Sequence, residues 1–307
     1  MQAIWTSMSG SVEAGLLYAL MALGVYITFR ILDFPDLTVD GSFTTGGAIA
    51  AVMINAGYSP WLATAAALAG GLVAGSLTGL LHAKGKINGL LSGILMMIAL
   101  YSINLRILGR PNMSLLGMDT IFPPIERDRR WMLLIVIAVV IVIIKLLIDA
   151  FLKTDLGLAL RATGDNAKMI GSFGANTDTT KIIGVSLSNG LVALSGAVIA
   201  MQQGFADISM GIGMIVIGLA SVIIGEALFG AKTVFRATLA VVLGSIGYRI
   251  VVALALRVDW LESSDVKLIT AVIVIIALVV PTASRSWTMK KQAYKRSREL
   301  AGSEAGR

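Results

Sequence analysis

Long apolar runs recur along almost the whole chain, and short polar segments separate them. A helix needs roughly 20 mainly apolar residues to cross a bilayer, at about 1.5 Å of rise per residue. Nine runs approach or meet this length, at residues 12–30, 40–56, 61–82, 88–105, 131–150, 181–203, 212–230, 236–256 and 267–283. The pattern predicts an all-α, polytopic membrane protein with about nine (8–10) transmembrane helices. The second and seventh runs are short and rich in glycine.

Composition supports a membrane protein and changes how the charge is interpreted. Only 14% of residues are charged and the mean hydropathy is +0.85, whereas soluble chains carry about 25% charged residues. The net charge of +7 gathers in the tail at residues 285–307. Basic tails next to a membrane span are typical of the cytoplasmic surface, so we interpret this charge as membrane-facing and exclude nucleic acid as a partner.

The distribution of Lys and Arg predicts the orientation. The segments on the side of the basic tail carry most of these residues, which predicts a cytoplasmic C-terminus and an N-terminus outside. The loop 106–130 carries five Arg although this orientation places it outside. We accept this exception because long loops follow the preference of Lys and Arg for the cytoplasmic side less strictly. We therefore divide the chain into a transmembrane domain at 1–284 and a basic cytoplasmic tail at 285–307.

Two five-residue motifs indicate an internal repeat. Residues 34–38 and 205–209 both read Phe-x-Asp-aliphatic-hydroxyl, 171 residues apart. At this offset, a repeat unit at about 12–105 aligns with a second unit at 181–283. The span at 131–150 is left as a connector. An odd number of crossings separates the units, so the repeat is inverted, as in many transporters whose substrate route lies at the repeat interface.

The repeat motifs and their neighbours are the candidate lining of that route: Asp36, Thr38, Asp40, Ser42, Phe43, Phe205, Asp207 and Ser209. A second interpretation stays open, in which Asp36 and Asp207 are N-cap residues that satisfy free N–H groups at helix starts. The two interpretations are compatible, because a helix that begins inside the membrane needs such a cap.

The loop at residues 152–181 is too polar to span a membrane but has the features of a helix. Asp165 or Asn166 is suited to cap a helix of about two turns that ends at Gly171 or Gly174. An apolar face is formed by Met169, Ile170 and Phe173. Such a helix either docks into a groove of a partner or lies on the bilayer surface.

These segments resemble a known family. The stretch Gly157-Leu-Ala-Leu-Arg161-Ala-Thr-Gly164-Asp165-Asn166, followed by Gly174-Ala-Asn176, is similar to the cytoplasmic loop of ABC importer permeases of the branched-chain amino acid and ribose type. The opening from Gly15 to Val25 is similar as well. Where the usual amino-acid permease has Asn-Phe-Ala-His-Gly, this chain has Asp-Phe-Pro-Asp-Leu-Thr-Val-Asp-Gly from Asp33. With Pro111–Gly117, that form resembles a subgroup assigned to tryptophan or tyrosine uptake.

The resemblance implies a set of partners and a location. The partners are a second permease subunit in a homodimer or heterodimer, two cytoplasmic ABC ATPase subunits, an extracytoplasmic solute-binding protein and membrane lipid. The location is the bacterial inner or plasma membrane. In the family this loop carries the coupling helix that contacts the ATPase, which gives these coupling residues: Arg161, Gly164, Asp165, Asn166, Lys168, Met169, Ile170 and Phe173.

Motifs for chemistry within the chain are few. Gly225–Thr233 resembles a phosphate loop but has one residue too many before Lys232. The single histidine, His82, has no neighbours at metal-ligand spacing. We therefore expect no enzyme activity, cofactor or metal here, with ATP and Mg²⁺ bound by the partner ATPase.

The candidates for functional charges inside the predicted spans are Glu13, Lys145, Glu226 and Arg249. Glu226 and Arg249 lie deepest, and we expect them to pair with each other or with backbone, or else to mark a gate. Gly71, Gly75 and Gly79 form a helix-packing stripe, either within the subunit or at a dimer seam.

Two functions remain from the sequence. The favoured one is the permease subunit of an ABC importer for a small polar solute, with an amino acid-like solute favoured. The alternative is an ion-coupled secondary transporter with inverted repeats, which would use Asp36, Asp40 and Asp207 as its buried ionisable groups.

Overall fold

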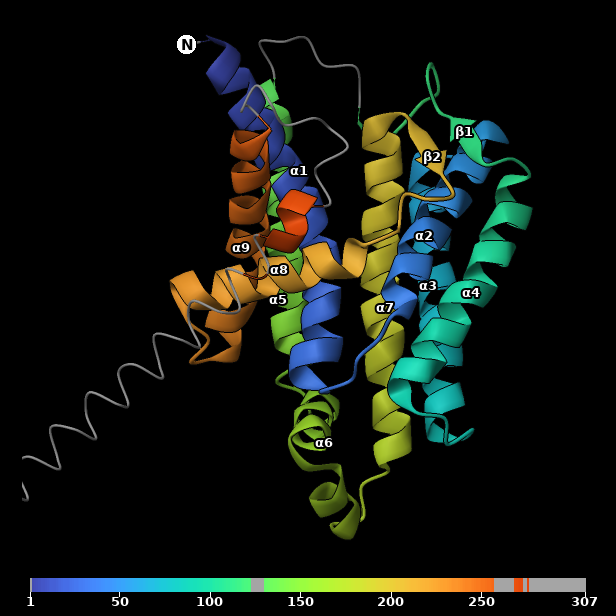
Figure 1. Ribbon diagram of the computed structural model, residues 1–307, viewed down its shortest axis with the longest axis vertical. Helices are drawn as coiled ribbons and strands as arrows, with labels where there is room; N and C mark the ends of the chain where they lie inside the picture. The colour runs from blue at the N-terminus through green and yellow to red at the C-terminus, as the bar shows by residue number, and fades with distance from the viewer. Residues whose placement is uncertain (1, 123–129, 257–267, 273–274, 276–307) are drawn as a thin grey trace, which may run out of the picture.

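The fold is a bundle of long helices with a small sheet at one end (Figure 1). The computed structural model describes residues 2–122, 130–256, 268–272 and 275. Most of the predicted run at 267–283 and the whole tail at 285–307 therefore lie outside the described residues. The helices and strands are, in chain order, α1 (Gln2–Tyr26), the π-helix η1 (Ile27–Ile31), α2 (Thr38–Asn55), α3 (Pro60–Ala83), α4 (Gly89–Leu108), β1 (Asn112–Ser114), α5 (Arg130–Phe151), α6 (Asp155–Ser172), α7 (Thr177–Gln203), β2 (Phe205–Asp207), α8 (Met214–Phe229) and α9 (Val234–Ala255).

The helix boundaries follow from capping residues in the sequence. Ser59 and Asn88 accept hydrogen bonds from backbone N–H groups in the first turns of α3 and α4. Asn176 does the same for α7, where it accepts from two N–H groups. Gly109 and Gly204 end α4 and α7 in the left-handed conformation, with φ of 67° and 78°, which glycine adopts without steric cost.

Six helices in the described part of the chain are long and apolar enough to cross a membrane, at Met8–Ile31, Pro60–Ala83, Gly89–Leu108, Trp131–Phe151, Thr177–Gln203 and Val234–Ala255. The second and seventh predicted runs are the helices α2 and α8, which are not among these six. In Figure 1, α8 runs across the long helices, and its 16 residues are too few for a typical span. The mainly helical, membrane-spanning prediction holds, and the antiparallel pair β1–β2 is an addition to it.

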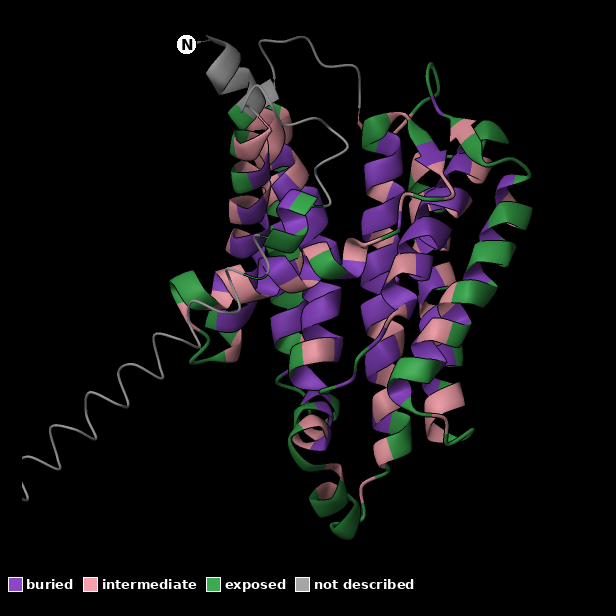
Figure 2. Ribbon diagram, viewed as in Figure 1, coloured by how far each residue is buried: buried purple, intermediate pink, exposed green. Residues whose placement is uncertain are grey.

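The helices of the bundle differ in how far they are buried. Figure 2 shows α1, α2 and α7 largely buried, whereas much of α4 and α5 is exposed. The exposed side chains of α5 are aliphatic, such as Ile135 and Leu147, which are 63% and 64% exposed. An apolar surface of this kind on a long apolar helix is suited to contact lipid acyl chains.

Glycines allow α7 to approach its neighbours at backbone distance. A Cβ atom on Gly46 of α2 would lie 1.8 Å from the Ala193 carbonyl oxygen, and one on Gly196 would lie 2.0 Å from the Phe43 oxygen. The stripe of Gly71, Gly75 and Gly79 also faces α7. The stripe is therefore a packing surface within the subunit.

Replacing Gly46 with alanine is expected to destabilise the bundle. The new methyl group would overlap the Ala193 oxygen, and overpacking of this kind costs about 1–3 kcal/mol or more. Gly247→Ala in α9 is the control, because no atom lies within 4 Å of its ideal Cβ position, and alanine is the better helix former. Thermal unfolding in detergent, followed by circular dichroism, should give a lower midpoint for Gly46→Ala only. Equal midpoints for the two variants would contradict this packing.

Candidate functional site

The loop helix α6 projects from one end of the bundle, at the bottom of Figure 1. Its backbone is kinked at Asn166 (φ −159°, ψ 90°), which divides α6 into two helical parts. The Asn166 side-chain oxygen accepts a hydrogen bond from the Met169 N–H at 3.0 Å. Gly174, with φ of 86°, follows the end of the second part. The predicted short helix is confirmed, with Asn166 as its cap.

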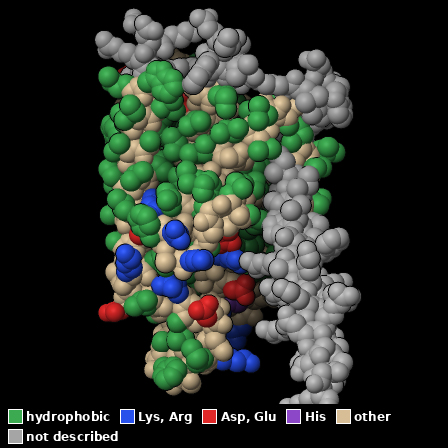
Figure 3. All heavy atoms as spheres, turned by 90° about the vertical axis from the view of Figure 1, so that its left-hand side faces the viewer, with side chains coloured by type: hydrophobic (Ala, Val, Ile, Leu, Met, Phe, Trp, Pro, Cys, Tyr) green, Lys and Arg blue, Asp and Glu red, His purple; other side chains and the backbone are tan. Residues whose placement is uncertain are grey.

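The second part of α6 presents apolar side chains to the outside. Phe173 is 80% exposed and Met169 is 48% exposed, whereas Ile170 is partly buried. Among the other predicted coupling residues, Arg161, Asp165 and Lys168 are exposed. Figure 3 shows that charged side chains gather mainly toward this lower end of the molecule, and that the upper part of the same face is hydrophobic.

Gly164 has a different environment from the other predicted coupling residues. A Cβ atom at this position would lie 1.8 Å from the Ile31 carbonyl oxygen and 3.0 Å from the Leu32 Cα. The backbone of α6 thus contacts the end of η1 directly. Short π-helical segments such as η1 occur frequently at functional sites. Gly164 is therefore an internal contact between α6 and the membrane helices.

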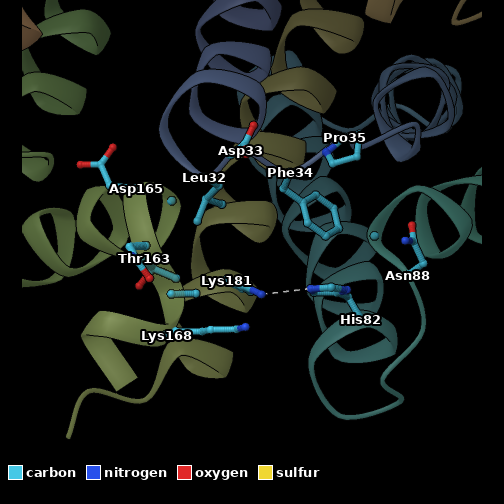
Figure 4. A pocket seen from close by; sticks show the side chains of 14 residues that line it. Leu32, Asp33, Phe34, Pro35, His82, Asn88, Thr163, Asp165, Lys168 and Lys181 are labelled. Atoms are coloured by element: carbon cyan, nitrogen blue, oxygen red, sulfur yellow. Dashed lines mark hydrogen bonds between the residues drawn. The ribbon is translucent and has the colours of Figure 1, made fainter. Parts of the chain in front are cut away.

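A pocket of about 460 Å³ opens beside this contact. Asp33, Phe34 and Pro35 from the turn after η1 line one side, and Thr163, Asp165 and Lys168 from α6 line another (Figure 4). His82 from the end of α3 and Lys181 from the start of α7 complete it, together with Asn88. The pocket joins four segments that are far apart in sequence.

His82 connects α3 to α7 in this pocket. Its Nε2 lies 3.2 Å from Lys181 Nζ, and its Nδ1 lies 2.8 Å from the Ile87 carbonyl oxygen. A lysine ammonium only donates hydrogen bonds, so Nε2 is the acceptor and Nδ1 carries the proton. His82 is partly buried, and the ring of Phe34 packs edge-on against it with the ring centroids 5.0 Å apart.

Asp40 accepts hydrogen bonds from free backbone N–H groups at the start of α8. Its two carboxylate oxygens accept hydrogen bonds from the Gly213 and Ile215 N–H groups, each at 2.8 Å. The approach is close, since a Cβ atom on Gly211 would lie 1.9 Å from the Asp40 carbonyl oxygen. A carboxylate at a helix N-terminus is favourable because the free N–H groups and the helix dipole both attract it. Asp40, one of the predicted route residues, therefore caps α8 from a neighbouring helix.

Asp36 belongs to a buried polar network at the start of α2. It accepts from the Thr38 N–H at 2.9 Å and from the Asn189 side chain at 2.7 Å. Asn189 in turn accepts from Ser42 at 2.7 Å, and Thr38 contacts Thr78 at 2.9 Å. Asp36, Thr38 and Ser42 are thus brought together and satisfied inside the bundle, where all three have no exposed surface.

Asp207 lies at the opposite end of the bundle, in β2, with Phe205 and Ser209 nearby. Its side chain accepts from the Ser209 N–H at 2.8 Å and from Asn112 at 3.4 Å. Partial burial would raise the pKa of Asp207, but these hydrogen bonds, with one from the Ser209 hydroxyl, lower it overall. The carboxylate therefore contributes stability above the ordinary Asp pKa, and this contribution is lost as the pH falls. Asp207 does not cap α8.

Phe43 lies apart from both sets of polar residues. Its side chain is fully buried and its ring stacks on Tyr18, with centroids 6.0 Å apart. The eight predicted route residues thus occupy four environments: the buried network of α2, the cap of α8, the aromatic stack on Tyr18 and the end of the bundle around β2. The sequence offered no signal for this division, because each position looks equally polar or aromatic within its motif.

The ion pairs of the membrane helices differ from the expected ones. Glu226 of α8 pairs with Arg30 of η1, with contacts of 2.8 and 2.9 Å. The expected pairing of Glu226 with Arg249 is wrong, because α8 runs across the bundle and brings its last turns to η1. Lys145 pairs with Asp149, which also accepts from the Thr238 hydroxyl at 2.6 Å. Among the described residues, no group of three or more His, Asp or Glu is arranged to hold a metal ion.

Comparison with known proteins identifies the family of this chain. Residues 7–280 match the family described as the branched-chain amino acid transport system permease component. The tyrosine transport system permease protein of Clostridioides difficile (strain R20291) is 46% identical over 292 residues, covering 94% of this chain and 96% of that protein. An uncharacterized protein of Rickettsia prowazekii (strain Madrid E), RP368, is 40% identical over 184 residues, 60% of this chain and 64% of its own length. No solved structure matches this chain.

Removal of the Asp40 carboxylate is expected to release the start of α8. Asp40→Ala leaves the Gly213 and Ile215 N–H groups without their acceptors, and the loss of an N-cap costs about 0.5–2 kcal/mol. Asp40→Asn keeps one acceptor oxygen and should retain most of the stability. Hydrogen exchange of α8 in detergent measures the effect, with faster exchange expected for Asp40→Ala than for Asp40→Asn. Identical exchange in both variants and the parent protein would show that Asp40 does not hold α8.

Proposed function

This chain belongs to the family of branched-chain amino acid transport system permease components, and we propose that it is the membrane-spanning subunit of an ABC importer. The observation that carries the proposal is the contact between Gly164 of α6 and Ile31 of η1. An exposed apolar helix is suited to bind a partner, and this one touches the membrane helices through backbone. Movement of α6 by a partner would therefore reach the bundle without an intervening flexible side chain.

The contacts of α8 continue the route by which a movement of α6 would reach the rest of the bundle. Arg30, one residue before Ile31, pairs with Glu226 near the C-terminal end of α8. Asp40 of α2 holds the N-terminal end of the same helix. A displacement of η1 would therefore act on α8 at one end while α2 holds the other. A partner that binds ATP could in this way bias the bundle between two arrangements.

The proposed partners follow from the family and from the two ends of the bundle. Two cytoplasmic ABC ATPases would bind at α6 through Arg161, Asp165, Lys168, Met169 and Phe173, and would hold the ATP and Mg²⁺. A solute-binding protein would dock at the β1–β2 end, and a second permease subunit would complete the pore. This arrangement has the α6 end and the C-terminus in the cytoplasm and the N-terminus outside. Residues 1–284 would form the permease domain, with 285–307 as a cytoplasmic tail.

We further propose that the chain is an inverted repeat. The motif residues Asp36 and Asp207 each accept a hydrogen bond from the backbone N–H two residues later, from Thr38 at 2.9 Å and from Ser209 at 2.8 Å. The two motifs thus share a local turn and lie toward opposite ends of the bundle, which supports units at about 12–105 and 181–283 and a full count of about nine spans. The connector at 131–150 would correspond to α5.

The proposed solute is an amino acid, and an aromatic one is favoured. The support is the similarity to a permease named for tyrosine transport, which extends over 94% of this chain. An ion-coupled carrier would need free acidic groups within the bundle to bind the proton or sodium ion. Asp36 and Asp40 instead have their carboxylates occupied by Asn189 and by the start of α8, which argues for the ATP-driven mode.

Replacement of Gly164 tests the path from α6 to the membrane. Gly164→Ala is expected to separate α6 from Ile31 and to lower solute uptake per ATP hydrolysed, while the ATPase still co-purifies. Gly171→Ala in the same helix is the matched control, since nothing lies within 4 Å of its ideal Cβ position. Uptake and hydrolysis are measured together in proteoliposomes. Equal coupling in both variants would remove Gly164 from the path.

The energy source is tested with the assembled complex in sealed vesicles. Uptake of tyrosine is expected to require ATP and to continue when ionophores collapse the proton and sodium gradients, because hydrolysis in the partner drives the transition. The control is a complex whose ATPase carries an inactivating substitution. Uptake that persists without ATP but stops with the ionophores would instead establish the ion-coupled carrier.

A further inference from the structure

Arg249 is a charged residue within the apolar helix α9. It lies six residues before the last helical residue, Ala255, which corresponds to about 9 Å of helix. The turns on either side of it are built from Val, Ile, Leu, Ala and Gly together with Tyr248. Ionisable residues inside membrane spans are costly, and they commonly mark substrate or ion pathways.

The guanidinium of Arg249 lies over an aromatic ring. Its Cζ lies 3.6 Å from the ring centroid of Tyr18 in α1. Tyr18 is only 5% exposed and is itself stacked on Phe43. A cation above a ring is stabilised by the ring face, but the N–H donors in the plane of the guanidinium are not used by this contact. The Arg249 Nε is buried and has no hydrogen-bond partner.

Two other cations of the membrane helices differ from Arg249 because each has an acidic partner. Lys145 and Arg30 each have an acidic partner, Asp149 and Glu226. Within the described residues, Arg249 makes no ion pair with any acid. Glu13 lies on the same helix as Tyr18 and accepts a hydrogen bond from Gln202 at 3.4 Å. The bundle therefore orients Arg249 and leaves its donors without an acid.

We propose that Arg249 binds the carboxylate of the transported solute, with Tyr18 as the platform that orients the guanidinium. A guanidinium offers two parallel N–H donors in one plane, and a carboxylate accepts both. This inference rests on the proposed function, since an amino acid carries such a carboxylate. A lipid phosphate would accept the same donors, but the depth of about 9 Å within α9 favours a solute in a route through the bundle over a headgroup at its surface.

The experiment compares binding of two probes to the purified permease–ATPase complex in nanodiscs. Saturation-transfer NMR measures the affinity of tyrosine and of tyrosinamide, which lacks the carboxylate, without a binding protein that would select between them. The parent complex should bind tyrosine about tenfold more tightly than tyrosinamide. Arg249→Gln should bring this ratio close to one, and Arg249→Lys should retain part of it, because lysine keeps the charge but not the planar pair of donors.

Two further variants make the outcome decisive. Arg236→Gln changes an exposed arginine at the start of the same helix and should leave the ratio unchanged. Tyr18→Leu keeps the Arg249 charge and removes the ring beneath it, so the ratio of tyrosine to tyrosinamide affinity should fall. This variant tests the proposal even if the Arg249→Gln complex does not assemble. A parent ratio near one, or the same ratio in the parent, Arg249→Gln and Tyr18→Leu complexes, would overturn the proposal. A ratio near one, together with effective competition by glycerol phosphate for the site, would also overturn the proposal and would assign the site to lipid. ATP-driven uptake by the parent complex would stand in each of these cases.

Discussion

A helix that begins inside a membrane bundle has N–H groups that only the protein itself can satisfy. At the start of α8 that requirement falls on Asp40, whose two oxygens accept from Gly213 and Ile215 at 2.8 Å. The cap comes from α2 and not from the chain beside α8. The position of α8 across the bundle therefore depends on α2, and α2 is in turn held by α3, α4 and α7.

Close backbone contacts give the bundle its rigidity. Gly46 and Gly196 bring α2 and α7 so near that no side chain fits between them. Gly164 brings α6 to the end of η1 in the same way. Tightly packed backbones move as units, so a change at α6 is passed on as a displacement. The exposed side chains of Met169 and Phe173 provide the surface on which a partner would act.

The charged residues of the bundle separate into two kinds. Glu226 and Asp149 have basic partners: the first pair connects α8 to η1, and the second lies within α5. Arg249 lies over the ring of Tyr18 and, among the residues that the structure describes, forms no ion pair with an acid. A pair that is complete stabilises one arrangement, whereas an oriented cation without an acid is available to a ligand. That difference is the basis for assigning Arg249 to solute binding.

The sequence by itself determined the helices and their ends, because apolar length, Ser, Asn and Gly caps, and the kink at Asn166 depend on neighbours within a few residues. It also indicated the family, through the stretch from Gly157 to Asn166. Only the tertiary structure decided that Asp40 caps α8, that Glu226 pairs with Arg30, and that Gly164 contacts Ile31. Asp40 and Gly213 are 173 residues apart, and Arg30 and Glu226 are 196 apart. Local pattern carries no information about such partners, since they depend on how α8 and η1 are oriented once the helices pack.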